Sequence, residues 1–281
     1  MPWVMLVSAC AGGGVAGPSG VPTTSTLVLA PWMTTALPVA TTTTAAPPPS
    51  PTTVPAPVVE PVAFDATEIG TSVAGRPLEV VTTGAGERRL YVVGGIHGDE
   101  RAAVANSERL ADIVASLLPD DVTMRWLLDA NPDGTAVDTR YNSRGVDLNR
   151  NWPTDHRPSL RHGIRPLSEP ESAALAADLG RFVPHVIVVL HADRGGPLAN
   201  YDGEGRHLAA AFAEGAGLDR RWRVEADVGV PTPGSLGTHY GKALGIPTIS
   251  VVLDPRDDPE AVFGELVLGF EALLGALVGD S

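Results

Sequence analysis

The stretch that decides the fold is LYVVGGIHGDE at residues 90–100, an apolar run that ends on the imidazole of His97 and the carboxylate of Glu100. A second apolar run, VIVVL at residues 186–190, also ends on a histidine, His191. Short apolar runs bounded by glycine or polar residues are typical of buried strands. Because the carboxyl ends of parallel strands meet at one edge of a sheet, the two histidines are predicted to share a site there.

Strand and helix patterns alternate on both sides of these runs. Strands are predicted over 89–95, 122–128, 186–190 and 247–253, helices over 100–118, 206–216 and 259–278, a turn at 131–134 and irregular chain over 135–167. Ser168 and Ser235 are predicted to cap two further helices, and Glu169 and Glu171 beside Ser168 are interpreted as structural. This alternation predicts one α/β domain with a mostly parallel or mixed central sheet flanked by helices. The last helix is apolar but carries Glu265 and Glu271, so we expect it to pack on the domain rather than cross a membrane.

The first 59 residues differ from the rest, because they hold no Asp, Glu, Lys or Arg. Residues 11–60 are rich in Ala, Thr and Pro and are predicted to form a disordered linker before the domain at 61–281. Residues 1–10 end in Val-Ser-Ala-Cys, which resembles a lipoprotein signal segment with Cys10 as the lipidated residue, although Met1–Ala9 lacks the usual positive charge. We therefore expect a secreted or cell-envelope protein, lipid-anchored on the outer face of the cytoplasmic membrane through Cys10.

The charge of the chain bears on its partners. The formal net charge of −13 lies wholly after residue 59, and such an acidic domain repels phosphate backbones. Nucleic acid is therefore not an expected partner.

His97, Glu100 and His191 form a candidate ligand set for one Zn²⁺ ion. Two neutral imidazoles and one carboxylate suit zinc and leave a fourth position open, which distinguishes catalytic from structural zinc sites. Hydrolysis is the first hypothesis. The alternative interpretation of the HxxE pair is a loop histidine beside a glutamate that begins a helix.

The segment RYNSRGVDLNRNWP at residues 140–153 is the second candidate site. It holds three Arg and three Asn in a stretch without helix or strand periodicity. Guanidinium groups bind carboxylates through two parallel hydrogen bonds, so the segment suits recognition of a carboxylate. A solvated charged loop is the alternative.

Taken together, the pieces HGDE, NPDG, GVDLNRNWP, SEPES and TPGS, with His191 after its strand, resemble the zinc carboxypeptidases of the carboxypeptidase A type. Among these the chain looks most like the murein peptide amidase A branch, which cleaves the γ-D-glutamyl–diaminopimelate bond of cell-wall peptides. The resemblance extends from about residue 69 to the C-terminus.

The resemblance implies roles for individual residues. His97, Glu100 and His191 match the zinc ligands, and Arg140 matches the arginine that stabilises the oxyanion. The pair that holds the terminal carboxylate of the substrate corresponds to Asn149 and Arg150, and a substrate-side loop to Thr232 through Ser235. Asp147 and Trp152 are expected to shape the loop.

One position departs from the family. The family's general base is a glutamate near the end of the last core strand, and Val252 stands at that position. Asp254 shares a strand face with it and is the substitute considered first, although it lies about 6–7 Å further along. Glu225 or Glu204 could reach in from elsewhere, or hydrolysis is lost and binding retained.

The resulting hypothesis is a zinc metallopeptidase-like domain that acts on peptidoglycan stem peptides with a free carboxylate, and whose hydrolysis is weakened by Val252. A zinc-binding pseudo-peptidase that only binds wall peptides is the alternative from the binding class. An N-acyl amino acid deacylase uses a similar ligand set, but the GVDLNRNWP and TPGS matches disfavour it.

Overall fold

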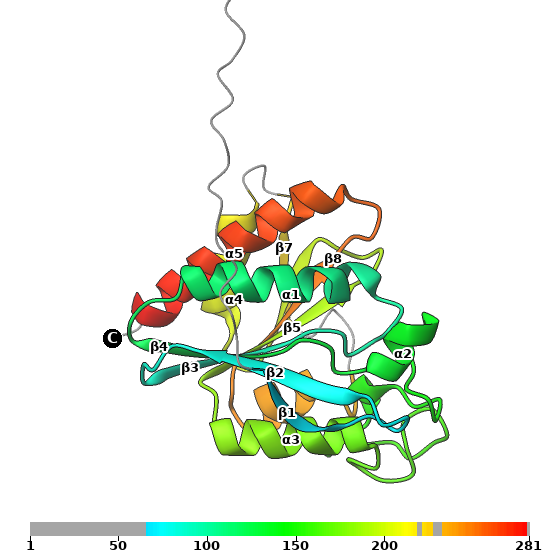
Figure 1. The fold of residues 1–281 in the computed structure, drawn as a ribbon. Helices are drawn as coiled ribbons and strands as arrows, with labels where there is room; N and C mark the ends of the chain where they lie inside the picture. Colours follow the sequence, from blue (N-terminus) through cyan, green and yellow to red (C-terminus); the bar gives the residue numbers. More distant parts are fainter. Residues whose placement is uncertain (1–65, 218–220, 227–231, 280–281) are drawn as a thin grey trace, which may run out of the picture. The chain divides into compact units, whose positions relative to one another are not determined.

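The computed structural model describes residues 66–217, 221–226 and 232–279. These residues belong to one compact unit, which forms an α/β fold (Figure 1). Cys10 and the linker predicted over 11–60 lie outside the described residues, so both stay predictions.

A mixed eight-stranded sheet forms the centre of this unit, in the order β1-β2-β4-β3-β5-β8-β6-β7. The strands are β1 (Thr67–Thr71), β2 (Pro77–Thr83), β3 (Arg88–Val93), β4 (Val122–Leu127), β5 (Val186–Ala192), β6 (Leu198–Asp202), β7 (Arg223–Ala226) and β8 (Thr248–Leu253). The four central strands β4, β3, β5 and β8 run parallel, and the antiparallel pairs lie on either side of them. The predicted mixed sheet is therefore confirmed.

Helices cover both faces of the sheet (Figure 1). One face carries α1 (Arg101–Ser116), α4 (Arg206–Ala216) and α5 (Pro259–Gly279), and the other carries α3 (Pro170–Phe182) and the π-helical segment η3 (Thr238–Ala243). Two shorter elements, α2 (Pro132–Val137) and the 3-10 turn η1 (Leu148–Arg150), lie in the connection between β4 and α3.

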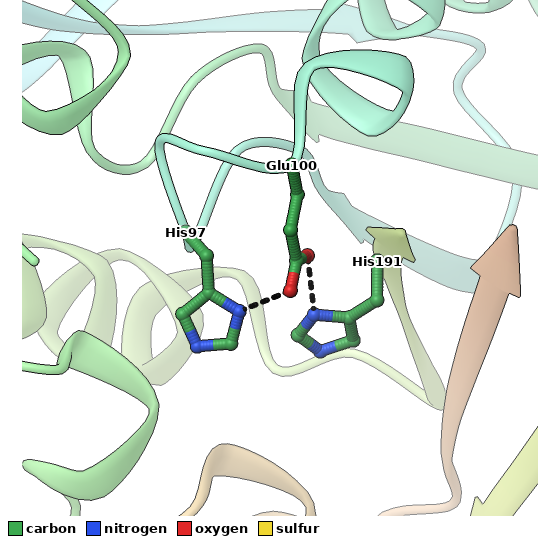
Figure 2. Close-up of side chains that lie close together, drawn as sticks. All are labelled: His97, Glu100 and His191. Carbon is green, nitrogen blue, oxygen red and sulfur yellow. Dashed lines mark hydrogen bonds and ion pairs between the residues drawn. The ribbon is translucent and has the colours of Figure 1, made fainter. Parts of the chain in front are cut away.

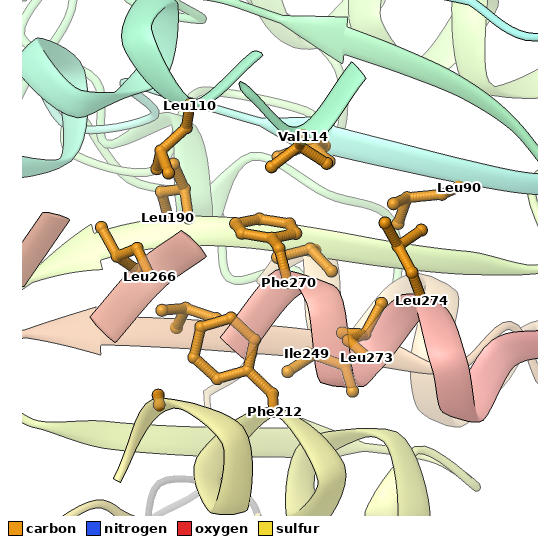
Figure 3. Packing of buried hydrophobic residues seen from close by; sticks show 14 of the residues in the cluster. Leu90, Leu110, Val114, Leu190, Phe212, Ile249, Leu266, Phe270, Leu273 and Leu274 are labelled. Carbon is orange, nitrogen blue, oxygen red and sulfur yellow. The ribbon is translucent and has the colours of Figure 1, made fainter. Parts of the chain in front are cut away.

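The larger core lies under α1, α4 and α5 and is built around Phe270 (Figure 3). The ring of Phe270 lies 5.3 Å from that of Trp126 on β4 and 5.6 Å, edge to face, from that of Phe212 on α4. At Gly269, a Cβ atom would lie 2.7 Å from the Phe212 ring, so glycine is what allows α5 to approach α4 closely. Each fully buried side chain of this size contributes about 1.5–3 kcal/mol to folding.

The helix α5 is long and apolar enough to cross a membrane by length and composition alone. In the structure its apolar face packs into this core through Leu266, Phe270, Leu273 and Leu274, which agrees with a core helix. The expectation that it packs on the domain is confirmed.

Two local predictions were wrong. The predicted turn at 131–134 is the start of α2, because Asn131 caps it by accepting the N–H of Gly134 and Pro132 occupies its first turn. Ser168 does not cap α3; Glu169 is the N-cap residue, and the Ser168 hydroxyl donates to the Glu169 carboxylate instead. Glu169 and Glu171 are structural, as expected, since both accept hydrogen bonds from the Asn142 side chain.

A buried ion-pair network joins α3 to the sheet. The carboxylate of Asp178, 1% exposed, accepts hydrogen bonds from the Tyr91 hydroxyl at 2.8 Å and from the Arg125 guanidinium at 2.6 and 2.9 Å. Burial alone would raise the pKa of Asp178, but these hydrogen bonds outweigh it and lower the pKa. The carboxylate therefore stabilises the fold as an anion.

We expect Asp178→Asn to lower the free energy of unfolding by about 2–4 kcal/mol, because it leaves Arg125 without its buried counterion. Since the folded-state pKa is depressed, the contribution of Asp178 is present above its unfolded pKa of about 4 and is lost as the pH falls below it. Urea unfolding at neutral and acid pH measures this: the gap between wild type and variant should narrow in acid. Asp120→Asn, at an exposed position, is the control. A gap that stays constant with pH would contradict the assignment.

Candidate metal centre

The site lies at the carboxyl ends of β3 and β5, which are adjacent parallel strands. His97 lies in the turn that leaves β3, His191 is the sixth residue of β5, and Glu100 is the residue at which α1 begins. At Gly98 a Cβ atom would lie 2.1 Å from the backbone of Gly134 in α2, so only glycine fits between the histidine and the glutamate. The turn is thus pressed against α2, and this contact fixes where His97 and Glu100 point.

The three predicted ligands come together in the structure (Figure 2). The Nδ1 atom of His97 lies 2.6 Å from Oε1 of Glu100, and the Nδ1 atom of His191 lies 2.9 Å from Oε2. One donor atom from each residue lies within 4.8 Å of the others, and all three side chains are buried. The backbone N–H of Ala192 also donates to Oε2, which holds the carboxylate in place.

The electrostatics of the cluster keep Glu100 ionised. Burial alone would raise the pKa of Glu100, but the neighbouring His191 and the hydrogen bonds with both histidines outweigh it and lower the pKa. The pKa of His97 is shifted in the other direction. Burial alone would lower it, but the hydrogen bonds with Asp147 and Glu100 outweigh burial and raise the pKa. A carboxylate is therefore available as an anionic ligand.

The donor set fits a zinc ion. Both imidazoles turn the same atom, Nδ1, towards the carboxylate, so three donor atoms of the types that Zn²⁺ prefers converge on one point. The second nitrogen of His97, Nε2, lies 3.2 Å from Oδ1 of Asp147. A carboxylate on the outer nitrogen of a ligating histidine is the usual arrangement that orients such a ligand.

Arg140 lies beside this cluster. Its Nη1 atom is 3.7 Å from Oε1 of Glu100, and its Nε donates to Oδ2 of Asp147 at 2.9 Å. Asp147 thereby connects His97 with Arg140, and it also accepts the backbone N–H of Asn149. Sequence reasoning assigned Asp147 only the shaping of the loop; the structure shows that the same carboxylate also contacts the cluster.

Asn149 and Arg150 follow in the turn η1. The backbone N–H of Leu236 donates to Oδ1 of Asn149 at 3.0 Å, so the amide group of that side chain faces the other way and has no partner among the described residues. Arg150 is partly buried and donates from Nη1 to the backbone carbonyl of Asn149 at 2.7 Å, which holds its guanidinium against the turn. Their N–H groups are of the type that binds a carboxylate.

The predicted loop Thr232–Ser235 packs against this segment. The carbonyl of Gly234 accepts the N–H of Trp152 at 3.0 Å, and the Ser235 hydroxyl accepts the N–H of Thr238 and donates to Thr232. The N-cap residue of η3 itself is Gly237, which has no side-chain capping bond, so Ser235 does not cap this element; its hydroxyl instead accepts the N–H of Thr238 across the helical residues 236–237. A polar hollow of about 510 Å³ opens between residues 155–157 and this loop, with Thr232 among its lining residues.

Val252, the residue at which the sequence is predicted to depart from the family, lies next to the last residue of β8. Val252 pairs in register with His191, so its side chain lies on the same face of the sheet beside that imidazole, and it is 8% exposed. Position 252 therefore places an aliphatic side chain, not a carboxylate, beside His191.

Asp254, the first substitute considered, turns to Arg256 instead. It accepts hydrogen bonds from the backbone N–H and the guanidinium of Arg256, and these lower the pKa of Asp254 to about 2. Glu225 pairs with Arg223 on β7, and Glu204 is exposed before α4. Among the described residues, none of the three has a hydrogen bond or ion pair with the cluster.

With this geometry in view, the class of protein is clear. Residues 60–201 match the zinc carboxypeptidase family, and the chain belongs to it. Among curated relatives it is 31% identical over 215 residues to murein peptide amidase A of Escherichia coli strain K12, covering 68% of this chain and 82% of the relative. Murein peptide amidase A of Vibrio campbellii is also 31% identical, over 208 residues, covering 67% and 79%.

Solved structures agree on the fold. The murein-tripeptide amidase of Escherichia coli O157 is 28% identical, with a TM-score of 0.60, covering 75% of this chain and 93% of that one. Carboxypeptidase A of Helicoverpa armigera is 17% identical with a TM-score of 0.66, covering 78% and 69%, and supports the fold alone. The family to which the chain belongs is named for zinc, which agrees with the donor set.

We expect Asp147→Asn to weaken zinc binding by about 10- to 100-fold, because the amide orients His97 less firmly than the carboxylate does. Competition with a chelator at neutral pH measures the affinity, and metal analysis should give one zinc per chain for the wild type. Asp155→Asn, at an exposed carboxylate eight residues later, is the matched control. Equal affinities for the three proteins would show that Asp147 does not orient the ligand.

Proposed function

We propose that this chain is a zinc metallopeptidase-like domain that binds murein stem peptides by their free carboxylate and hydrolyses the γ-D-glutamyl–diaminopimelate bond slowly. The observation that carries the proposal is the convergence of His97, Glu100 and His191 beside Arg140. The names of the curated relatives support the substrate class, since both are murein peptide amidases.

In this proposal His97, Glu100 and His191 hold one Zn²⁺ ion. A zinc ion in a three-ligand site supplies Lewis acidity and lowers the pKa of water to about 7. Because the Glu100 carboxylate is held by the N–H of Ala192 and lies within 2.9 Å of Nδ1 of both histidines, the three proposed ligands are already brought together by the fold.

Arg140 would stabilise negative charge on the carbonyl oxygen of the cleaved bond. Its guanidinium is held towards the cluster by Asp147, so it needs no reorganisation as charge develops. A positive group fixed in this way acts on the transition state more than on the neutral substrate.

Asn149 and Arg150 would hold the free carboxylate of the peptide. Leu236 fixes the amide orientation of Asn149 and directs its two N–H groups away from the 232–236 loop. Together with the Arg150 guanidinium these donors can satisfy both carboxylate oxygens. Substrates without a free carboxylate leave these partly buried donors unsatisfied and bind weakly.

The proposed reaction lacks an efficient group for proton transfer. Hydrolysis needs a group that takes a proton from water and delivers one to the leaving amine, and Val252 does neither. Positioned acid–base catalysis is worth about 10²–10⁴ in rate, so turnover is reduced by roughly this factor. Asp254 is the substitute considered first, but its pKa of about 2 makes it a poor base.

The same observation favours a second candidate function, a zinc-binding pseudo-peptidase that binds wall peptides without cleaving them. The ligand set and the carboxylate-binding residues are all present, whereas the residue beside His191 is aliphatic. Prolonged incubation of a muropeptide with the zinc-loaded protein separates the two: released diaminopimelate supports the slow enzyme, and tight binding without release supports the pseudo-peptidase.

We expect Val252→Glu to raise muropeptide hydrolysis by about 10²–10⁴, because it returns a carboxylate to the position beside His191. Release of diaminopimelate under single-turnover conditions measures the rate. Val252→Gln has nearly the same shape but cannot accept a proton, and it is the matched control.

Asp254→Asn tests the substitute base. If Asp254 takes no part, this variant should hydrolyse at the wild-type rate both alone and combined with Val252→Glu. Loss of the residual wild-type activity in Asp254→Asn would show that Asp254 does act as the base. A Val252→Glu rate no higher than that of Val252→Gln would contradict the assignment of position 252.

We expect Arg150→Ala to weaken binding of a muropeptide by about 10- to 100-fold, because it removes a charge-assisted hydrogen bond worth about 1.5–3 kcal/mol. Calorimetry with the free acid and with the C-terminally amidated peptide measures the effect. The amidated peptide should bind wild type and variant equally weakly. Zinc content should not change, and a parallel loss of zinc would show that the variant disturbs the metal site instead.

A further inference from the structure

The turn at residues 157–165 carries the two most exposed large apolar side chains of the described residues. Leu160 is 87% exposed and Ile164 is 77% exposed. Each is followed directly by an arginine, Arg161 and Arg165, and the turn begins at a third arginine, Arg157. The turn therefore carries exposed apolar side chains next to basic ones.

This exposure is fixed by the backbone. Ser159 and Gly163 form a β-bridge, and the Ser159 hydroxyl accepts the N–H groups of residues 161 and 162. The buried side chain of Asn151 donates to the carbonyls of His162 and Arg165, which ties the base of the turn to the segment that carries Asn149 and Arg150. Leu160 and Ile164 are thus held out from the domain on a rigid support.

The charge of the turn is opposite to that of the chain. Arg157, Arg161 and Arg165 are exposed, and within the described part of the chain none of them forms an ion pair. Arg161 instead stacks on the Tyr141 ring at 4.3 Å and donates to the carbonyl of Gly145. Asp155 is the one carboxylate between residues 148 and 168, in a chain of net charge −13.

We propose that this turn docks on an anionic lipid surface, with Leu160 and Ile164 in the interface and the three arginines against the headgroups. Two highly exposed apolar side chains in a turn with three exposed arginines combine the apolar and basic groups that bind an anionic lipid interface. Basic residues near an anionic leaflet each add to the attraction. A wall polymer would satisfy the arginines but would not bury the Leu160 and Ile164 side chains. The proposal does not depend on metal binding or hydrolysis.

Vesicle binding tests this. The full-length chain with Cys10→Ser, which cannot be acylated, is sedimented with vesicles of phosphatidylcholine alone or with about one third phosphatidylglycerol. We expect binding only to the anionic vesicles, weakened when salt rises from about 0.1 M to about 0.5 M. Leu160→Ser with Ile164→Ser should lower the partition coefficient at least about tenfold, and Arg157, Arg161 and Arg165→Gln about 100-fold.

The control replaces two exposed apolar side chains elsewhere, Val183→Ser with Leu244→Ser, and should bind like the parent. Absence of binding to anionic vesicles overturns the proposal. Unchanged binding of both turn variants also overturns it, because another part of the chain would then carry the interaction. Sedimentation with insoluble peptidoglycan provides the last comparison: loss of that binding alone in the arginine variant would assign the turn to the wall polymer and overturn the lipid surface.

Discussion

The carboxylate of Glu100 is the group on which the site depends. Its oxygens contact the Nδ1 atoms of His97 and His191 and accept the backbone N–H of Ala192. The two histidines follow or end different strands. A buried carboxylate in these surroundings is costly unless it is paired, so the fold must deliver both imidazoles to it. The parallel pairing of β3 with β5 does this, because it places the two strand ends side by side.

The rest of the site extends from that carboxylate through Asp147. One of its oxygens faces His97 and the other faces Arg140, so the residue that orients a proposed metal ligand also orients a proposed oxyanion donor. Burial would raise the pKa of Asp147, but the hydrogen bond to His97 and the charges of Arg140 and Arg150 lower it. Asp147 also caps the turn that presents Asn149. A change at this one carboxylate therefore disturbs metal ligand, oxyanion donor and carboxylate-binding turn together.

The sequence allowed the fold class and the ligand cluster to be predicted, and the reason is physical. The central strand β5 is buried on both faces, so its first five residues are a continuous apolar run, and α4 was predicted with its observed ends at residues 206 and 216. The outer strands β1 and β7 are exposed and short, and β6 carries Asn200 and Asp202, so none of them has a distinctive pattern. Two features could not be predicted from a local sequence pattern, because they form only when separate segments pack together. These are the contacts of Asp147 and the hydrogen bonds from Asn151 to the turn at 157–165.

Position 252 shows how far family membership and chemistry can separate. The register of β5 and β8 places residue 252 beside His191 whether it is a valine or a glutamate, because backbone hydrogen bonds set the register. The side chain decides proton transfer, whereas metal binding and carboxylate recognition use other residues. In the proposed function, the absence of the base removes one catalytic factor and leaves the proposed binding residues in place. Asp254 cannot simply take over, since the guanidinium of Arg256 that stabilises it as an anion also removes its basicity. In the proposed function, peptide recognition is therefore retained and the aliphatic side chain of Val252 limits the rate of hydrolysis.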